Sequence, residues 1–152
     1  MKKLLLTLCL MALIGVGLYA YLNSRTVKIM DAHHGQYTAQ ILVDHLPWSH
    51  SASINWWLKN QSSILKQYNI PSADADGPIF ITIYAFGDGY KEAGKKDRRC
   101  FDEMQATKNC IDKNILMSVR RTRDGDTEFS FDDVAYLRNQ DGKITRSSRD
   151  EY

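Results

Sequence analysis

One uncharged, apolar run near the N-terminus limits what this chain can fold into more than any other feature. Residues 4–22 (LLLTLCLMALIGVGLYAYL) contain no charged side chain, and Lys2 and Lys3 precede the run. At about 1.5 Å per residue, a helix of this length extends roughly 28 Å, which is close to the ~30 Å hydrocarbon core of a bilayer. The run therefore predicts one transmembrane helix that contacts the lipid bilayer through residues 4–22.

A cleaved signal peptide is the alternative interpretation of the same run. Cleavage requires small residues three positions and one position before the cut, and the nearest match pairs Leu18 with Ala20. Leu18 is too large for such a position, so the sequence favours a retained signal anchor. We therefore expect a membrane anchor over residues 1–25 and one soluble domain over residues 26–152.

The charges that flank the run bear on the orientation of the chain and on its partners. Lys2 and Lys3 favour a cytoplasmic N-terminus, whereas Arg25 and Lys28 argue weakly for the opposite orientation. Residues 26–152 carry 17 Lys and Arg against 18 Asp and Glu, a net formal charge of −1. Because nucleic-acid-binding domains usually present a basic footprint, we expect no nucleic acid partner.

Two cysteines provide a second indication of the compartment. Cys100 and Cys110 are the only cysteines after the span. Without a CxxC motif or a nearby histidine they supply half of a zinc site, so a disulfide is favoured and free thiols are the alternative. A disulfide requires an oxidising compartment. Together with the N-terminal lysines, it predicts a single-pass protein of a bacterial inner membrane with its C-terminal domain in the periplasm.

Apolar periodicity predicts an α+β domain in which one helix packs on a small, mostly antiparallel sheet. The helix is expected from Ser51 or Ser53 to Tyr68, and residues 79–86 (IFITIYAF) are apolar enough for a central strand covered on both faces. No clear element is predicted between residues 86 and 115, so this segment is expected to be a loop pinned by the disulfide. Further strands are expected over residues 27–32, 37–43, 115–123, 127–131 and 143–145, with Met117, Val119, Phe129 and Phe131 facing inward.

Several strings of residues resemble a known family. They are Asn55-Trp56-Trp57-Leu58, Tyr68-Asn69-Ile70-Pro71, residues 86–91 (FGDGYK), residues 99–102 (RCFD) and residues 109–114 (NCIDKN). These strings resemble the enterobacterial putative membrane proteins catalogued as a domain of unknown function, and the resemblance extends from the span to about residue 145. It implies an inner-membrane protein of an enteric bacterium and supplies no catalytic residues.

The patterns that point to catalysis are weak. Ser63 and Lys66 match the SxxK spacing of serine acyl enzymes that act on peptidoglycan, but the companion SDN and KTG motifs are absent from the sequence. The histidines form no HxxxH or HExxH pair, so we expect neither a metal nor another cofactor. A small envelope hydrolase acting on peptidoglycan or lipid, through Ser63 and Lys66 or the histidines, remains the alternative function. The histidines are His33, His34, His45 and His50.

Binding residues are the other candidates. A helical wheel places Trp56 about 140° from the centre of the apolar face, among polar residues that include Asn60. Either the N-terminal hairpin or the long loop covers Trp56, or it is an exposed interface anchor of the kind common at binding hot spots. Trp48 presents the same two alternatives. A basic run that includes Lys91, Arg98 and Arg99 suits either local ion pairs or an anionic partner.

These candidates favour a function without chemistry. We expect a membrane-tethered, non-catalytic module that binds a protein in the periplasm or the membrane. An immunity or envelope-accessory role would fit such a module.

Overall fold

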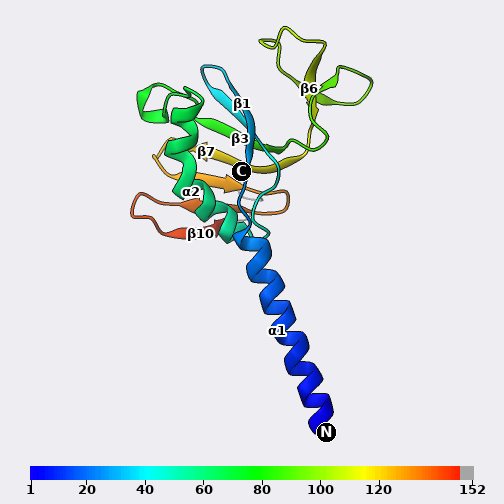
Figure 1. The fold of residues 1–152 in the computed structure, drawn as a ribbon. Coiled ribbons are helices and arrows are strands. Elements are labelled where there is room, and N and C mark those ends of the chain that lie inside the picture. Colours follow the sequence, from blue (N-terminus) through cyan, green and yellow to red (C-terminus); the bar gives the residue numbers. More distant parts are fainter. Residues whose placement is uncertain (148–152) are drawn as a thin grey trace.

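The N-terminal segment forms a long helix that extends away from the rest of the chain. In a computed structural model that describes residues 1–147, α1 (Lys2–Ser24) has no buried residue. By length and composition it is able to cross a membrane. Figure 1 shows α1 projecting from one end of the domain that follows it. The last five residues of the predicted soluble domain, 148–152, lie outside the described residues.

The domain is built on a seven-stranded sheet with the strand order β1-β2-β3-β7-β8-β9-β10. Among the strand pairs described, β2 and β3 are parallel and the other neighbours in this sheet are antiparallel. The predicted α+β fold with a mostly antiparallel sheet is therefore confirmed. The strands are β1 (Ile29–His34), β2 (Thr38–Val43), β3 (Phe80–Ala85), β7 (Ile115–Arg121), β8 (Thr127–Ser130), β9 (Ala135–Arg138) and β10 (Ile144–Ser147).

The helix α2 (His50–Gln67) makes the connection between the two parallel strands. It begins after Ser49, whose Oγ accepts a hydrogen bond from the Ala52 N–H at 3.2 Å, as a helix N-cap does. A short 3₁₀ helix, η1 (Ala73–Ala75), follows before β3. The predicted helix is confirmed, but its N-cap is Ser49, two residues before Ser51, so neither predicted cap residue is correct.

The main hydrophobic core lies between α2 and one face of the sheet. Trp57 and Ile64 of α2 are buried there against alternate residues of the strands. This alternation follows from the period of two along a strand. The inward positions predicted for the later strands are confirmed, because Met117, Val119, Phe129 and Phe131 all belong to this core.

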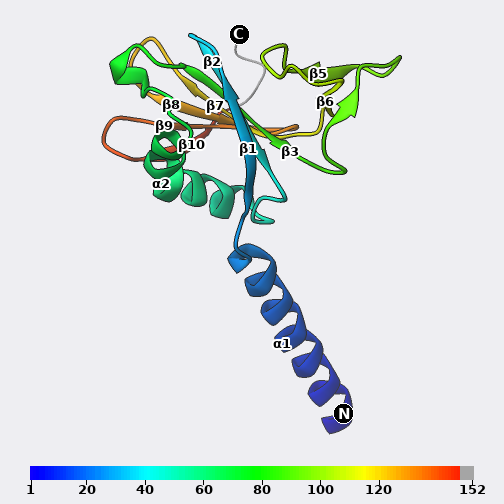
Figure 2. The same ribbon diagram turned by 45° about the horizontal axis from the view of Figure 1, so that its top comes forward.

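A second, smaller core lies on the opposite face of the sheet. Leu42 and Tyr84 pack there against Phe101 and Ile111. Because Ile81 and Ile83 of β3 face the main core and Tyr84 faces the second, the prediction of a strand covered on both faces is confirmed. Figure 2 shows α2 and the cover of the second core on opposite sides of strands β1–β3.

The segment predicted as a loop contains regular structure. Between residues 86 and 115 three strands form a separate sheet in the order β4-β6-β5, with β4 (Lys91–Glu92), β5 (Arg98–Cys100) and β6 (Lys108–Asp112). Their lengths of two, three and five residues are too short to give a recognisable apolar period. This small sheet is the part of the fold that the sequence pattern did not predict, together with β9.

Candidate functional site

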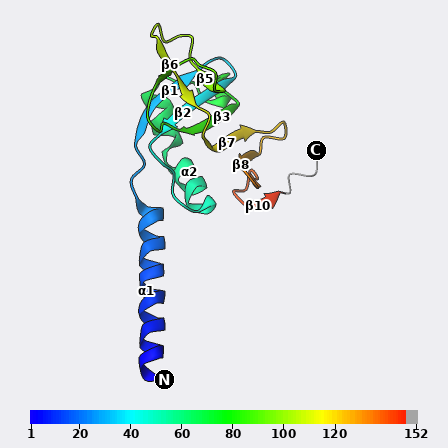
Figure 3. The ribbon, with the colours of Figure 1, turned by 90° about the vertical axis from the view of Figure 1, so that its right-hand side faces the viewer.

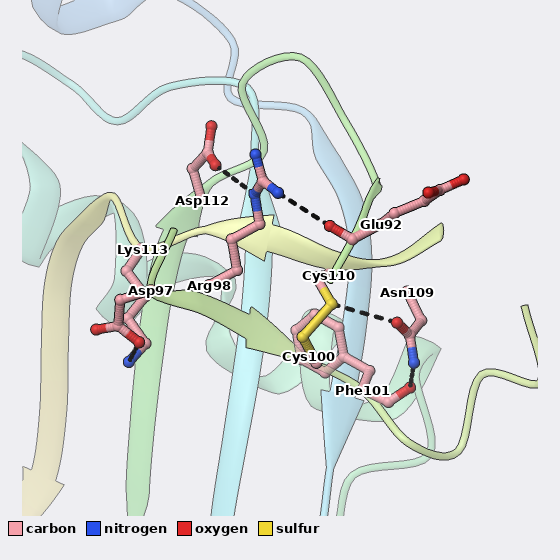
Figure 4. The surroundings of a disulfide bond; sticks show 9 residues. All are labelled: Glu92, Asp97, Arg98, Cys100, Phe101, Asn109, Cys110, Asp112 and Lys113. Carbon is pink, nitrogen blue, oxygen red and sulfur yellow. Dashed lines mark hydrogen bonds and ion pairs between the residues drawn. A yellow bond between two sulfur atoms is a disulfide. The ribbon is translucent and has the colours of Figure 1, made fainter. Parts of the chain in front are cut away.

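The disulfide lies in the small sheet and is confirmed as a structural link. Cys100 of β5 and Cys110 of β6 are bonded, and their Cα atoms are 3.9 Å apart in the antiparallel pair. Figure 4 shows the bond beside Phe101, whose carbonyl accepts a hydrogen bond from Asn109 Nδ2 at 3.1 Å. Since Phe101 is 2% exposed in the second core, the disulfide holds a residue that attaches the small sheet to the main sheet.

Two basic residues of the small sheet, Lys91 and Arg98, are engaged in local ion pairs. Asp112 accepts from Lys91 Nζ at 2.5 Å and from Arg98 Nε at 3.0 Å. The hydrogen bond from Lys91, followed by that from Arg98, lowers the pKa of Asp112 to about 2. Arg98 also donates to the Glu92 carbonyl at 2.9 Å (Figure 4). Arg99 is exposed, with its guanidinium carbon 5.8 Å from the centre of the Phe101 ring.

A hydrogen-bonded network ties β1 to the same segment. The buried His33 lies with Nδ1 2.7 Å from Glu103 Oε1 and Nε2 2.7 Å from the Tyr90 hydroxyl, and its ring stacks on Phe101. Burial, followed by the bond to Asp31, raises the pKa of Tyr90. Its single proton is donated to Asp31 Oδ2 at 2.6 Å. These polar groups are hydrogen-bonded to one another, as buried polar groups in folded proteins usually are.

The remaining candidates for chemistry are not assembled into a site. Ser63 and Lys66 are both exposed on α2, and no hydrogen bond joins them among residues 1–147. His34 is exposed at the end of β1, while the ring of His50 stacks on Phe131 with the centroids 4.0 Å apart. Within the described residues, no group of three or more His, Cys, Asp or Glu side chains is placed to hold a metal ion.

The tryptophan candidates lie where α1 meets the domain. Trp48 is 70% exposed, and its ring contacts Tyr19 of α1 edge-on with the centroids 6.2 Å apart. Trp56 is half-buried against the edge of the main core. The Nδ2 group of Asn60 donates to the Trp56 carbonyl at 2.7 Å. The Oδ1 atom of Asn23 accepts from the Ser49 N–H at 2.8 Å and thereby joins the end of α1 to the start of α2.

A groove of about 520 Å³ opens at this junction, and we call it the juxtamembrane groove. It runs between the end of α1, the linker to β1 and the first half of α2. Its lining residues are Asn23, Ser24, Arg25, Thr26, Val27, Pro47, Ala52, Asn55, Trp56, Lys59 and Asn60.

The six predicted interface residues therefore do not share one surface, because Trp48, Trp56 and Asn60 lie near α1 and Lys91, Arg98 and Arg99 lie in the small sheet.

A different apolar surface lies at the end of the domain remote from α1. The Tyr37 carbonyl accepts from the N–H groups of Ile79 and Phe80 at 3.2 and 3.3 Å, which brings the backbones of the three residues together. Their exposed fractions are 66%, 51% and 37%. We call these three residues the distal surface. Figures 1 and 3 show the β1–β2 turn, to which Tyr37 belongs, at the far end of the domain from α1.

A groove of about 270 Å³ borders the distal surface at Ile79. Leu65 of α2 lines it, and so do Asp74 and Arg121, which form an ion pair. The segment that forms one wall is tightly folded, because a Cβ on the buried Gly77 would lie 2.1 Å from the Pro71 carbonyl oxygen.

Sequence reasoning missed the distal surface. Ile79 and Phe80 belong to the apolar run that predicted a covered central strand. A period of two shows which face of the sheet each side chain of a strand points to. It does not show at which residue the helix or loop that packs on that face ends. The signal that was present is the length of the run, since eight apolar-rich residues exceed the six that the structure places in β3.

The comparisons with known proteins identify one family. The family model described as "Enterobacterial putative membrane protein (DUF943)" matches residues 1–148. No curated protein and no solved structure matches the chain.

Proposed function

This chain belongs to the enterobacterial putative membrane protein family, and we propose that it is a non-catalytic protein-binding module. In this proposal α1 anchors the chain in the inner membrane and residues 26–152 lie in the periplasm. The Cys100–Cys110 disulfide and the lysines before α1 support that orientation. The alternative of a small envelope hydrolase lacks support from the geometry, because Ser63 and Lys66 are both exposed on α2 and no hydrogen bond joins them within residues 1–147.

The distal surface is the observation that carries the proposal. Tyr37, Ile79 and Phe80 expose large apolar side chains at one end of the domain, and Ile79 borders a groove there. Contiguous exposed apolar residues next to a groove are typical of protein interaction sites. Because the distal surface points away from α1, a periplasmic protein would reach it without competition from the bilayer. Anchoring also confines the module to the membrane and raises its local concentration there.

Site-specific photo-crosslinking in living cells tests this function. A photoreactive amino acid replaces Tyr37 or Ile79 in the full chain, and the matched control carries it at Asp141, an exposed position in the β9–β10 turn. We expect a discrete protein adduct from positions 37 and 79 that is absent from position 141. A Phe80→Asp change should weaken the adduct formed from position 79. If positions 37 and 79 give no more protein adduct than position 141, the distal surface is not the binding site.

A further inference from the structure

The juxtamembrane groove lies at the depth of the lipid headgroups if α1 spans a bilayer as proposed above. Its residues Asn23, Ser24 and Arg25 directly follow the uncharged run that ends at Leu22. The contact between Tyr19 and Trp48 places a tryptophan beside the last turns of the span. Trp and Tyr are enriched at this level of membrane proteins, where the rings contact the boundary between lipid chains and headgroups.

The groove presents positive charge without a counter-charge from the protein. Arg25 and Lys59 line it, and no carboxylate is among its lining residues. Neither base forms an ion pair with another residue in the part of the chain that the structure describes. By contrast, Lys91 and Arg98 of the small sheet share the carboxylate of Asp112. The two bases of the groove are thus available to an external anion.

Neutral hydrogen-bonding groups complete the lining. The side-chain amide of Asn55 and the hydroxyl of Thr26 are exposed. The indole of the half-buried Trp56 forms part of the wall. A phosphodiester headgroup that carries a glycerol presents both anionic oxygens and hydroxyl groups. The two bases of the groove can bind the anionic oxygens, and its neutral groups can hydrogen-bond to the hydroxyls.

We propose that the juxtamembrane groove binds the headgroup of an anionic phospholipid from the leaflet in which α1 ends. Arg25 and Lys59 contact the phosphate, and the neutral groups contact a headgroup such as the glycerol of phosphatidylglycerol. This site accounts for a feature of the sequence that the orientation leaves unexplained. Positive charge at Arg25 runs against the positive-inside bias, and a lipid phosphate on that side of the membrane is its counter-charge.

Native mass spectrometry of the full chain in detergent tests the proposal. The protein is delipidated and then titrated with phosphatidylglycerol or, separately, with phosphatidylcholine of the same chain length. The variants are Arg25→Gln, Lys59→Gln and the double substitution. Lys66→Gln is the matched control, because Lys66 is an exposed lysine of the same helix that does not line the groove.

The expected result is one retained phosphatidylglycerol that the wild type and Lys66→Gln bind equally. Each groove substitution should weaken retention about fivefold, and the double substitution about 25-fold, since a base near an anionic surface contributes roughly that factor. Equal retention of phosphatidylcholine, or an equal loss in Lys66→Gln, would overturn the proposal. So would displacement of the lipid by inorganic phosphate at the same concentration.

A separate measurement keeps this inference distinct from the proposed function. Resistance of the full chain to alkaline carbonate extraction reports whether α1 spans a membrane, and it does not depend on the groove. If the protein is extracted, the anchor fails and the groove has no bilayer to contact. If it resists extraction and the groove variants retain lipid as the wild type does, the lipid site alone is wrong.

Discussion

At the scale of single residues, Phe101 attaches the small sheet to the rest of the domain, together with Ile111 of β6. Phe101 follows Cys100 directly and is 2% exposed against Leu42 and Tyr84 of the main sheet. The ring of His33 stacks on it with the centroids 3.8 Å apart. The disulfide, the second core and the His33 network therefore meet at one side chain, so loosening one of them affects the others.

Removal of the disulfide should lower the stability of the domain. Closing a loop between residues ten apart restricts the unfolded chain by about 2–3 kcal/mol in the chain-entropy model. We expect the double substitution Cys100→Ala and Cys110→Ala to reduce the free energy of unfolding by that amount in urea titrations of the detergent-solubilised chain. Cys9→Ser is the control, because Cys9 is a free cysteine on the exposed surface of α1. An unchanged midpoint in the double variant would contradict the expectation.

Asp112 should make the stability of the small sheet depend on pH. Its folded pKa, about 2, lies below the ordinary value of 3.8, because Lys91 and Arg98 bind the ionised carboxylate. A depressed folded pKa contributes stability that is present above the unfolded pKa and is lost as pH falls through the folded one. We therefore expect wild-type stability to decline between pH 4 and pH 2 and the decline to be shallower in Asp112→Asn.

Thermal unfolding monitored from pH 7 to pH 2 measures this difference. Asp112→Asn should be less stable than the wild type at pH 7, since Lys91 and Arg98 lose their partner. Asp141→Asn is the control, because Asp141 is exposed and no ion pair involves it within residues 1–147. Its pH dependence should follow that of the wild type. Parallel curves for wild type and Asp112→Asn would show that the ion pairs do not stabilise the fold.

At the scale of elements, the predictions succeeded where hydrophobic burial alone decides the structure. The period of α2 and the alternation along β7 and β8 follow from one buried face each, so they can be read from the sequence. The small sheet depends on the disulfide and on ion pairs between residues such as Lys91 and Asp112, which lie 21 positions apart. Contacts of that kind leave no periodic pattern.

The same distinction applies to the candidate site. Trp48 contacts Tyr19, which lies 29 positions earlier in the chain, and no local pattern indicates such a contact. A helical wheel placed Trp56 off the apolar face, and this agrees with its half-buried position. The parallel pairing of β2 with β3 likewise arises because α2 crosses over the sheet, a choice between topologies that strand patterns do not encode.

The N-cap of α2 offers a test of how this element is held. Ser49 accepts from the Ala52 N–H through its side chain and donates its own N–H to Asn23. We expect Ser49→Ala to lower the free energy of unfolding by about 1 kcal/mol, the usual effect of removing a serine cap. Ser51→Ala is the control at an exposed position in the first turn, where stability should be unchanged. Equal effects of the two substitutions in urea titrations would argue against the cap.

At the scale of the whole molecule, the connection between anchor and domain is short. Four residues, 25–28, separate the end of α1 from the start of β1. The Asn23–Ser49 hydrogen bond and the contact between Tyr19 and Trp48 bridge the same junction. The chain therefore attaches its domain to α1 through side chains as well as through the backbone, and the distal surface is held on the side away from α1.

The proposed orientation can be measured with a single introduced cysteine. Asp141→Cys places a thiol at an exposed turn, while Cys100 and Cys110 are blocked by their disulfide. In cells whose outer membrane is permeabilised, we expect a membrane-impermeant maleimide to label this variant. The wild type is the control and should stay unlabelled, because its free cysteine lies in α1. Labelling that requires lysis of the inner membrane would place the domain in the cytoplasm instead.

The short connection has a kinetic consequence for any partner. A domain on a long flexible tether explores a hemisphere, so its binding surface meets other proteins at many angles and heights. Here the linker has four residues and the junction is bridged, so in the proposed anchored state we expect the distal surface to keep a nearly constant height above the membrane. Encounters with a second membrane-bound protein then become a two-dimensional search, in which lateral diffusion sets the rate and only partners that extend to the same height are met.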